Sequence, residues 1–403
     1  MSVRVDRSSF RQRHTYLAAL TTELAAPLLR QWARHLAVAP AKPPSAWRRA
    51  VLLSSTHIGD ILYRSASLPH FKHALPECRL TYLCSPLTRD LLETHPAVDD
   101  VLAIAETGAD WRRAAVSVLR AGAFDVALCT DHIAYQHDLL LATRAGIPSR
   151  VGFAHKGFSA LVTHPVAPPA NVPYAGYTRA LIASVGELTP TWDLTPVLVT
   201  TPDDERQADA VWRALELGAA PTTIACTMTL RQETTATWPP EAFIAALEHV
   251  ARAINLEVVL CGSAADAPVL RAAAALARFP CRVAAGALGL RALGALFRRC
   301  RLLLAMDSGP RHIANAVGTP VVFVRSLKAI RIEAGVYCAN ETDVAPDEER
   351  LTLDAQRAAL ARLQPDAVAA VILERLAPLH QPYETSPAGG TSVAESNRRS
   401  PVT

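Results

Sequence analysis

The stretch Val51–Leu62, VLLSSTHIGDIL, decides how the fold is read. An apolar run typical of a buried strand ends in small hydroxyl residues, passes a short His-Ile-Gly turn and meets Asp60 where a helical pattern begins. A strand that leads directly into a helix is the start of a βαβ unit. Asp60 then has two open interpretations. It either caps the helix, or it is a base directed into a cleft at the carboxyl end of the strand.

Strand-like and helix-like segments alternate after residue 50, which favours parallel sheets. The first strands are predicted at Ala50–Ser54, Arg79–Cys84, Asp100–Ile104, Phe124–Cys129 and Arg150–Phe153. Helices are predicted at Asp60–Ala74, Leu87–Thr94, Trp111–Ala121, Tyr135–Arg144 and, after a proline-rich loop, Ala175–Val185. These elements predict one doubly wound domain.

A second alternating set follows the stretch Glu187–Pro202, whose prolines and lack of helical period indicate a linker. Its strands are predicted at Thr222–Thr227, Glu257–Cys261, Arg282–Ala284, Leu302–Ala305 and Pro320–Val324. Its helices are predicted at Asp203–Glu216, Pro240–Ala253, Ala264–Arg278, Leu290–Arg299, Pro310–Val317, Leu353–Leu363 and Asp366–Leu376. The fold class is therefore α/β, with two Rossmann-like doubly wound parallel-sheet domains facing a cleft.

The length of 403 residues exceeds what one hydrophobic core usually supports, which agrees with two domains and extra segments. We place a basic amphipathic helical extension at residues 1–49 and the first domain at 50–195. The second domain is expected at 196–380. Residues 381–403 are small and polar, and we expect a disordered tail there.

Positive charge is concentrated in the extension. Residues 1–50 hold nine Arg and Lys against two acids, a net +7, so the remainder carries −3 of the total +4. This distribution disfavours nucleic acid as a partner. Six apolar residues at helical spacing form a stripe there: Leu17, Leu20, Leu24, Leu28, Trp32 and Leu36. Pro27 is expected to kink or split that helix, which either packs on its own domain or lies on an anionic membrane surface.

The cysteines indicate a reducing compartment. Eight are scattered along the chain without a C-x-x-C pair, and most lie in or beside apolar runs. Buried free thiols are therefore expected rather than disulfides or a zinc site. No run of about 20 apolar residues predicts a membrane span, and the arginine-rich start lacks the apolar core of a signal peptide. We expect a cytoplasmic protein.

A second informative loop is AMDSGPRHIANAVGTPVV, residues 305–322. A strand gives way to Asp307, Ser308 and Gly309, and Pro310 suits the first turn of a helix because its missing N–H is not needed there. The free N–H groups at such a helix start favour an anion, and a phosphate is the expected occupant. Arg311 and His312 would stand beside it. An ordinary capped turn remains an equal alternative on these residues alone.

The pairing of SSTHIGDIL with DSGPRHIANAVGTPVVFV resembles bacterial glycosyltransferase family 9, which contains the lipopolysaccharide heptosyltransferases. Further pieces support the resemblance in order along the chain: LPHFKHALPECRLTYLCSP, HPAVDDVL, RVGF, WPPEAF and PDAVAAVILERL. Together they cover residues 50–376. The ordered combination is specific, although each piece alone is weak.

The resemblance implies a GT-B fold and an inverting transfer of a sugar, such as heptose, from a nucleotide diphosphate sugar to a lipopolysaccharide-core or related glycan or glycolipid acceptor. It implies no cofactor, and the chain has no D-x-D pair for a metal. Asp60 would be the general base. Donor contacts are expected from Asp307, Ser308, Gly309, Arg311, His312, Thr229 and Arg231, and acceptor-side contacts from Thr56, His57, Gly59 and Asp131. The enzyme would work on the inner face of the membrane.

One departure from the family pattern concerns the donor side. Family members usually carry a lysine two residues before the tryptophan of a K-x-W-P motif, where this chain has Ala236 before Trp238. Arg231, Arg325 or Lys328 are candidates to replace that charge, with the different reach and fork geometry of arginine. The missing lysine keeps open a nucleotide-sugar-binding protein without catalysis. The two-domain layout, which nucleotide-sugar epimerases share, keeps open an epimerase.

Overall fold

The computed structural model describes residues 24–36, 38–53, 57–105, 110–130, 136–153, 158–229 and 235–377. Within these residues, the first sheet has six strands: β1 (Arg49–Leu53), β2 (Arg79–Cys84), β3 (Asp100–Ala103), β4 (Val126–Cys129), β5 (Ser149–Phe153) and β6 (His164–Val166). Their order is β3-β2-β1-β4-β5-β6, and every neighbouring pair is parallel. This is the doubly wound order of a Rossmann domain.

The second sheet repeats that order in the described residues. It contains β7 (Thr222–Thr227), β8 (Leu256–Gly262), β9 (Cys281–Ala285), β10 (Leu302–Met306), β11 (Val321–Val324) and β12 (Glu341–Asp343), arranged β12-β11-β10-β7-β8-β9 with all pairs parallel. The predicted fold class is confirmed. In each sheet the direction of winding reverses beside the first strand, between β1 and β4 and between β7 and β10, where ligands of such sheets bind.

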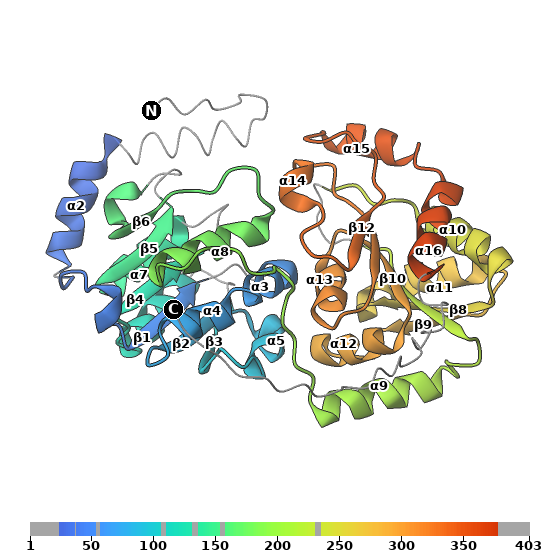
Figure 1. Cartoon of the computed structure of the whole chain (residues 1–403), viewed down its shortest axis with the longest axis horizontal. Coiled ribbons are helices and arrows are strands. Elements are labelled where there is room, and N and C mark those ends of the chain that lie inside the picture. The colour runs from blue at the N-terminus through green and yellow to red at the C-terminus, as the bar shows by residue number, and fades with distance from the viewer. Residues whose placement is uncertain are drawn as a thin grey trace, which may run out of the picture.

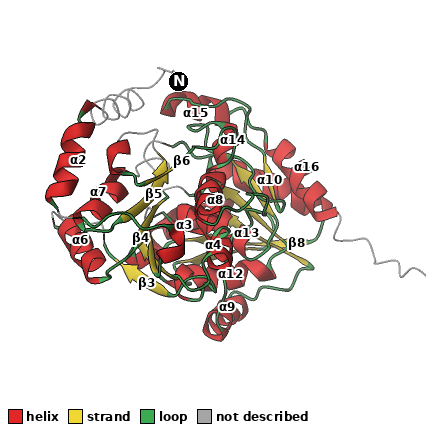
Figure 2. Ribbon diagram, turned by 60° about the vertical axis from the view of Figure 1, so that its left-hand side comes forward, coloured by secondary structure: helices red, strands yellow, loops and turns green. Residues whose placement is uncertain are grey.

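Helices cover both faces of each sheet (Figures 1 and 2). The first domain has α3 (Ile58–Ser65), α4 (Leu68–Ala74), α5 (Asp90–Glu93), α6 (Trp111–Ala121), α7 (Gln136–Arg144) and α8 (Tyr174–Val185), with 3₁₀ turns at Pro44–Ala46, Pro86–Thr88 and Ser159–Leu161. The second has α9 (Pro202–Ala214), α10 (Pro240–Ala253), α11 (Ala267–Leu276), α12 (Leu290–Arg299), α13 (Gly309–Ala316), α14 (Arg331–Ala334), α15 (Leu353–Leu360) and α16 (Pro365–Leu376), with a 3₁₀ turn at Ala264–Asp266.

Continuous apolar strands explain the two-sided covering. Ala50–Leu53 of β1 are fully buried, as are all residues of β10 and β11. Strands that are buried on both faces read as apolar runs, which is the pattern of parallel sheets. All eight cysteines are free thiols, and seven of them are buried, as predicted from their apolar surroundings.

One predicted helix is divided in the structure, and two edge strands were not predicted, each for a local reason. The helix predicted at Asp60–Ala74 is two helices, because Pro69 lies in the first turn of α4 and cannot continue a preceding helix. The edge strand β6 contains Pro165 and falls in the stretch that was interpreted as a loop. The edge strand β12 has only three residues, two of them acidic, and gives no apolar signal.

The helix α2 (Ala26–His35) packs on its own domain with a face that shares only Trp32 with the predicted stripe. Leu29, Trp32 and Ala33 contact the core of the first domain, whereas Leu24 and Leu28 are 75% and 68% exposed. Pro27 lies in the first turn of α2, which begins directly after a turn at Ala25, as expected for a helix that is split near this proline. The earlier part of the predicted extension, residues 1–23, and the predicted tail lie outside the described residues.

Residues 186–201 contain no helix or strand and connect the two sheets. The domains also contact each other directly. Leu62 of α3 and Leu91 of α5 are buried in a core cluster that belongs mainly to the second domain. Arg291 of α12 donates a hydrogen bond to the backbone oxygen of Asp90, at 3.0 Å. These contacts set α3 against α13, which lie side by side in the middle of the molecule (Figure 1).

Candidate active site

The first helix tip follows β1 and carries Asp60. Ile58, Gly59 and Asp60 are the first three residues of α3, and His57 is the N-cap. The Tyr63 hydroxyl donates a hydrogen bond to Oδ1 of Asp60 at 2.7 Å, and Nδ1 of His57 lies 3.7 Å from Oδ2. The Asp60 side chain keeps 22% of its surface exposed. Asp60 is therefore inside the helix start rather than its N-cap, and its carboxylate remains accessible.

The second helix tip follows β10 and carries the D-S-G residues. Ser308 is the N-cap of α13 in an extended conformation, and its hydroxyl donates back to the Met306 oxygen at 3.2 Å. In the described residues no side chain caps this helix start. Asp307 lies just before the tip and is 15% exposed. An uncapped helix N-terminus at the carboxyl end of a central strand is suited to bind an anion.

The two tips touch across the domain boundary through glycines. A Cβ atom on Gly59 would lie 2.7 Å from Cδ2 of His312, and a Cβ atom on Gly309 would lie 2.9 Å from Cβ of Ile58. Any side chain at either position would therefore force the tips apart. This contact explains why small residues are needed at both places, and it brings Asp60 to the same boundary as the D-S-G residues.

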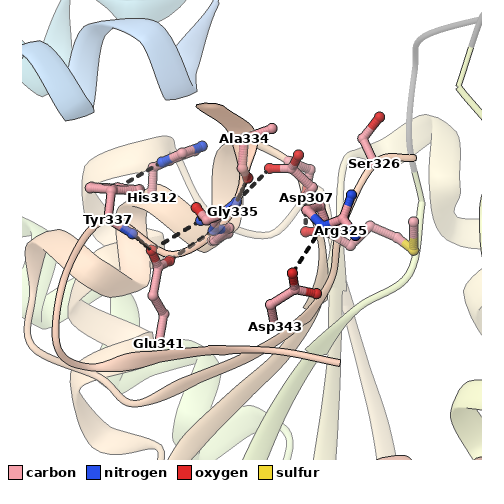
Figure 3. A network of polar contacts seen from close by, with 12 residues as sticks. Asp307, His312, Arg325, Ser326, Ala334, Gly335, Tyr337, Glu341 and Asp343 are labelled. Carbon is pink, nitrogen blue, oxygen red and sulfur yellow. Dashed lines mark hydrogen bonds and ion pairs between the residues drawn. The ribbon is translucent and has the colours of Figure 1, made fainter. Parts of the chain in front are cut away.

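Arg311 is the shared hydrogen-bond donor of a buried polar network. Figure 3 labels its acceptors: Asp307, Ala334, Gly335 and Glu341. Its Nε and Nη2 donate to the Glu341 carboxylate at 2.8 and 3.0 Å, and its Nη1 donates to Oδ1 of Asp307 at 2.8 Å. The two remaining N–H groups donate to the backbone oxygens of Ala334 and Gly335. All five N–H groups are thus used within the protein. We therefore reassign Arg311 from the expected donor contact to a residue that positions Asp307.

Electrostatics agree with a permanently charged network. Burial opposes the charge of Arg311, but Glu341 and Asp307 together raise its pKa above the ordinary value. Burial alone would raise the pKa of Glu341, yet Arg311, the Asn315 amide and the Tyr337 N–H hold that pKa below its usual range. The donor-side acid is thus next to a fixed positive charge, whereas Asp60 has a neutral hydroxyl as its hydrogen-bonding neighbour.

His312 extends the network to the domain boundary. Its Nδ1 lies 2.7 Å from the Tyr337 hydroxyl, and the two rings stack with centroids 5.5 Å apart. The Tyr63 ring approaches it edge-on from the first domain at 6.2 Å. Burial, and then the charge of Arg311, lower the pKa of His312 to about 4. The imidazole is therefore neutral at physiological pH.

Arg325, one of the residues considered as a substitute for the missing lysine, is fully buried beside Asp307 (Figure 3). Its Nε donates to the Asp343 carboxylate at 2.9 Å, and its Nη2 donates to the Pro346 oxygen at 2.8 Å. Its Nη1 is buried and has no hydrogen-bond partner in the described part of the chain. A buried, charged N–H group without an acceptor is costly and needs an explanation.

The remaining predicted residues are spread around these tips. Thr229 is half-buried just after β7, and His57 is exposed at the α3 tip. Lys328 is exposed after β11. Thr56, Asp131 and Arg231 lie outside the described residues, so their expected roles stay predictions.

Three further residues have local structural roles. Asp266 accepts hydrogen bonds from the backbone and hydroxyl of Ser263 in a capping box, so its carboxylate is engaged at a helix start. Trp238 is buried and donates to the Leu363 oxygen at 3.3 Å, which confirms it as a core residue. Thr130 donates to the Leu53 oxygen at 3.0 Å and joins the ends of β4 and β1.

Four residues of this site were missed. Tyr63 is three positions after Asp60, and the i, i+3 spacing on one helix face would have indicated the contact. Asn315 lies on α13 itself, four positions after Arg311, so its spacing would also have indicated a shared helix face. Tyr337 and Glu341 gave no such signal, because they meet α13 only through the packing of that helix against β12 and the segment before it.

The described residues lack two kinds of feature. No group of three or more His, Cys, Asp or Glu is arranged to hold a metal ion. No helix there is long and apolar enough to cross a bilayer.

Comparison with known proteins identifies the family. Residues 112–324, more than half of the chain, match the model of glycosyltransferase family 9 (heptosyltransferase). The chain belongs to glycosyltransferase family 9. A lipopolysaccharide core heptosyltransferase, OpsX of Haemophilus influenzae, is 25% identical to this family 9 protein over 282 residues. The match covers 67% of this chain and 77% of that relative.

Solved structures of the family share the two-domain GT-B fold. The glycosyltransferase family 9 protein of Veillonella parvula superposes with a TM-score of 0.69 at 18% identity, covering 85% of this chain and 99% of its own. The Escherichia coli heptosyltransferase WaaC, solved with ADP, superposes with a TM-score of 0.62 at 17% identity, covering 81% and 99%. At these identities the likeness establishes the fold. The family match makes this chain a glycosyltransferase and favours transfer over epimerisation.

Proposed function

We propose that this family 9 protein is an inverting heptosyltransferase that moves heptose from a nucleotide diphosphate heptose to a lipopolysaccharide-core acceptor, with Asp60 as general base. The observation that carries the proposal is the meeting of two helix tips at one boundary, one with an accessible carboxylate and the other with an uncapped N-terminus. Its similarity to a lipopolysaccharide core heptosyltransferase and to a heptosyltransferase solved with ADP supports this choice of substrates.

The reaction assigns a different task to each tip. The Asp60 carboxylate accepts the proton of the attacking acceptor hydroxyl, whose oxygen forms a bond to the anomeric carbon of the heptose. The bond from that carbon to the diphosphate oxygen breaks, and the nucleotide diphosphate leaves with its electron pair. Donors at the α13 tip stabilise the negative charge that develops there. Asp307 is unsuited to be the base because it already pairs with Arg311.

Arg325 is our candidate for the missing charge on the diphosphate side. Its Nη1 is buried beside Asp307 without an acceptor in the described residues, and a phosphate oxygen would satisfy it. We extend the proposal to a reaction that needs no metal, because helix N-termini and arginine supply the required positive potential. Transfer should then continue in excess EDTA, and restored activity only on adding a divalent ion would refute this part.

Arg325→Met tests the phosphate contact. The variant should bind ADP at least about tenfold more weakly, as expected for loss of a charge-assisted hydrogen bond, and should bind adenosine as the wild type does. Asp343→Asn is the matched control, because it alters the same ion pair and keeps the arginine. Equal losses for ADP and adenosine would show a structural effect and contradict the assignment.

We also propose that α2 contacts an anionic membrane surface, where a lipid-linked acceptor is located. Leu24 and Leu28 project from the molecule, and Arg30 and Arg34 are exposed on the same helix, which has no acid in its described turns. Flotation with vesicles of anionic lipid should retain the protein, and neutral vesicles should not. Replacing both leucines by serine should abolish retention, and unchanged retention would refute the contact.

A single assay tests the transferase proposal. The protein is incubated with ADP-heptose and lipopolysaccharide that lacks its heptose region, and products are followed by mass spectrometry and NMR. One added heptose with release of ADP is expected. Conversion of the donor without acceptor would instead indicate an epimerase.

The absence of the usual lysine supports one alternative, a binding protein without catalysis. Its place is taken by the buried Ala236, whose N–H donates to the Gln356 side chain. In that case ADP-heptose raises the melting temperature, yet neither transfer nor hydrolysis occurs.

A further inference from the structure

The directions of the hydrogen bonds around His312 follow from the Glu341 carboxylate, which can only accept hydrogen bonds. Glu341 is ionised next to Arg311, so its oxygens accept hydrogen bonds. The Asn315 side chain faces Oε2 of Glu341 at 2.7 Å and must therefore present its Nδ2 amide. This fixes the orientation of the Asn315 side chain.

The second N–H of the same amide determines what the tyrosine does. Nδ2 of Asn315 lies 3.2 Å from the Tyr337 hydroxyl, so the phenolic oxygen accepts from it. The hydroxyl has one hydrogen of its own to donate. In the described residues its other hydrogen-bond partner is Nδ1 of His312 at 2.7 Å. The tyrosine therefore donates, and Nδ1 of His312 accepts.

A neutral imidazole whose Nδ1 accepts carries its proton on Nε2. Nε2 lies at the domain boundary, 2.8 Å from where a Cβ atom on Gly59 would be, close to the tip that holds Asp60. No described residue accepts a hydrogen bond from it. The alternative tautomer would leave the Tyr337 hydrogen without an acceptor in the same buried surroundings.

We infer that Asn315 and Tyr337 are positioning residues that hold His312 as the Nε2–H tautomer, which presents a hydrogen-bond donor to an oxygen of the bound nucleotide diphosphate sugar. The ligand part of this inference rests on the proposed function, whereas the tautomer does not. The oxygen belongs either to the diphosphate or to the sugar, and both accept such a hydrogen bond. The network thus prepares a donor at the boundary before substrate arrives, which avoids reorganisation during the reaction.

The tautomer is read directly from two-bond ¹H–¹⁵N correlation spectra of histidine-labelled, full-length protein at pH 7.5. The chain has 13 histidines, and His312→Gln identifies the signal. We expect a neutral ring protonated on Nε2 in the wild type. Tyr337→Phe removes the hydrogen donated to Nδ1 and should shift the signal toward the other tautomer or a mixture. Tyr177→Phe, a half-buried tyrosine of the first domain, should leave it unchanged.

Ligand additions separate the two oxygen sources. A change of the His312 signal with ADP indicates a diphosphate oxygen, and a change only with ADP-heptose indicates a sugar oxygen. No change with either ligand, when both bind, overturns the ligand-facing role. A wild-type ring protonated on Nδ1, or charged, overturns the tautomer whether or not the protein transfers heptose. Transfer by Tyr337→Phe should fall about tenfold in kcat, as expected for one misdirected hydrogen bond.

Discussion

The tips of α3 and α13 look alike in sequence and differ in how their acids are held. Each follows a central strand at the reversal point of its sheet, and each carries a glycine that touches the other tip. Asp60 on α3 accepts a hydrogen bond from the Tyr63 hydroxyl, has Nδ1 of His57 at 3.7 Å, and stays partly exposed. Asp307 beside α13 is paired with a fully bonded, buried arginine. A general base needs a carboxylate that can accept a proton. A binding site needs a carboxylate whose charge stays constant.

This difference shows that a place directly after a central strand does not by itself define the role of an acid at a helix start. Asp307 is held in an ion pair with the buried guanidinium of Arg311, at 2.8 Å. The surroundings of Asp60 leave it accessible to an acceptor hydroxyl. The following predictions test this division of labour between the tips.

The largest effect is expected from removing each carboxylate in turn. Asp60→Asn keeps the shape of the side chain and removes the base, so kcat should fall by about 10²–10⁴-fold while the affinity for ADP stays within about threefold. Asp307→Asn should mainly weaken binding of the donor sugar nucleotide. Transfer rates and calorimetric titrations measure both. If both variants lose mainly kcat, or both lose mainly affinity for the donor, the proposed difference between the two tips is wrong.

A large loss of stability is expected at the α13 tip only. Arg311→Met leaves Glu341 buried without its partner, which should lower the free energy of unfolding by about 3–5 kcal/mol in urea titrations. The control is Arg206→Met, which removes an exposed ion pair with Asp203 and should cost about 0.5 kcal/mol or less. Similar losses in both variants would show that the network is not buried as described.

Acid should destabilise the protein through His312. Its folded pKa of about 4 is below the unfolded value of 6.5, so the unfolded chain binds more protons between these values and stability falls as pH drops from 6.5 to 4. His312 contributes at most about 3 kcal/mol to this loss. Burial also lowers the pKa of His95 to about 4. His95 lies away from the two tips and should add a similar loss of stability at acid pH. His312→Gln should flatten the pH dependence of chemical unfolding, and an unchanged slope would contradict its buried neutral state.

The smallest effect is expected from removing the Tyr63 hydroxyl, which donates a hydrogen bond to Asp60. Tyr63→Phe removes one hydroxyl-to-carboxylate hydrogen bond and should lower kcat about tenfold or less, with the KM for the donor unchanged. Steady-state kinetics with saturating acceptor measure it. A loss as large as that of Asp60→Asn would mean that Tyr63 itself takes part in the proton transfer.

The sequence predicted the parts of this site that depend on local order. Alternating strands and helices imply parallel sheets, and residues directly after β1 and β10 must lie at the carboxyl edges, which is why Asp60 and Asp307 were found. The Arg311–Glu341 pair could not be predicted from the sequence, because the two residues are 30 positions apart and a buried ion pair leaves no periodic signal. The predicted stripe of α2 was only partly right, because Trp32 packs on the domain while Leu24 and Leu28 are exposed and Leu29 packs instead.

A structure of the complex with ADP and a lipopolysaccharide-core acceptor tests the central claim most directly. We expect the diphosphate at the α13 tip, beside Ser308 and Nη1 of Arg325, and the acceptor hydroxyl about 2.6–3.2 Å from the Asp60 carboxylate. A diphosphate bound elsewhere, or an acceptor hydroxyl beyond hydrogen-bonding distance of Asp60 with another base in its place, would contradict the account.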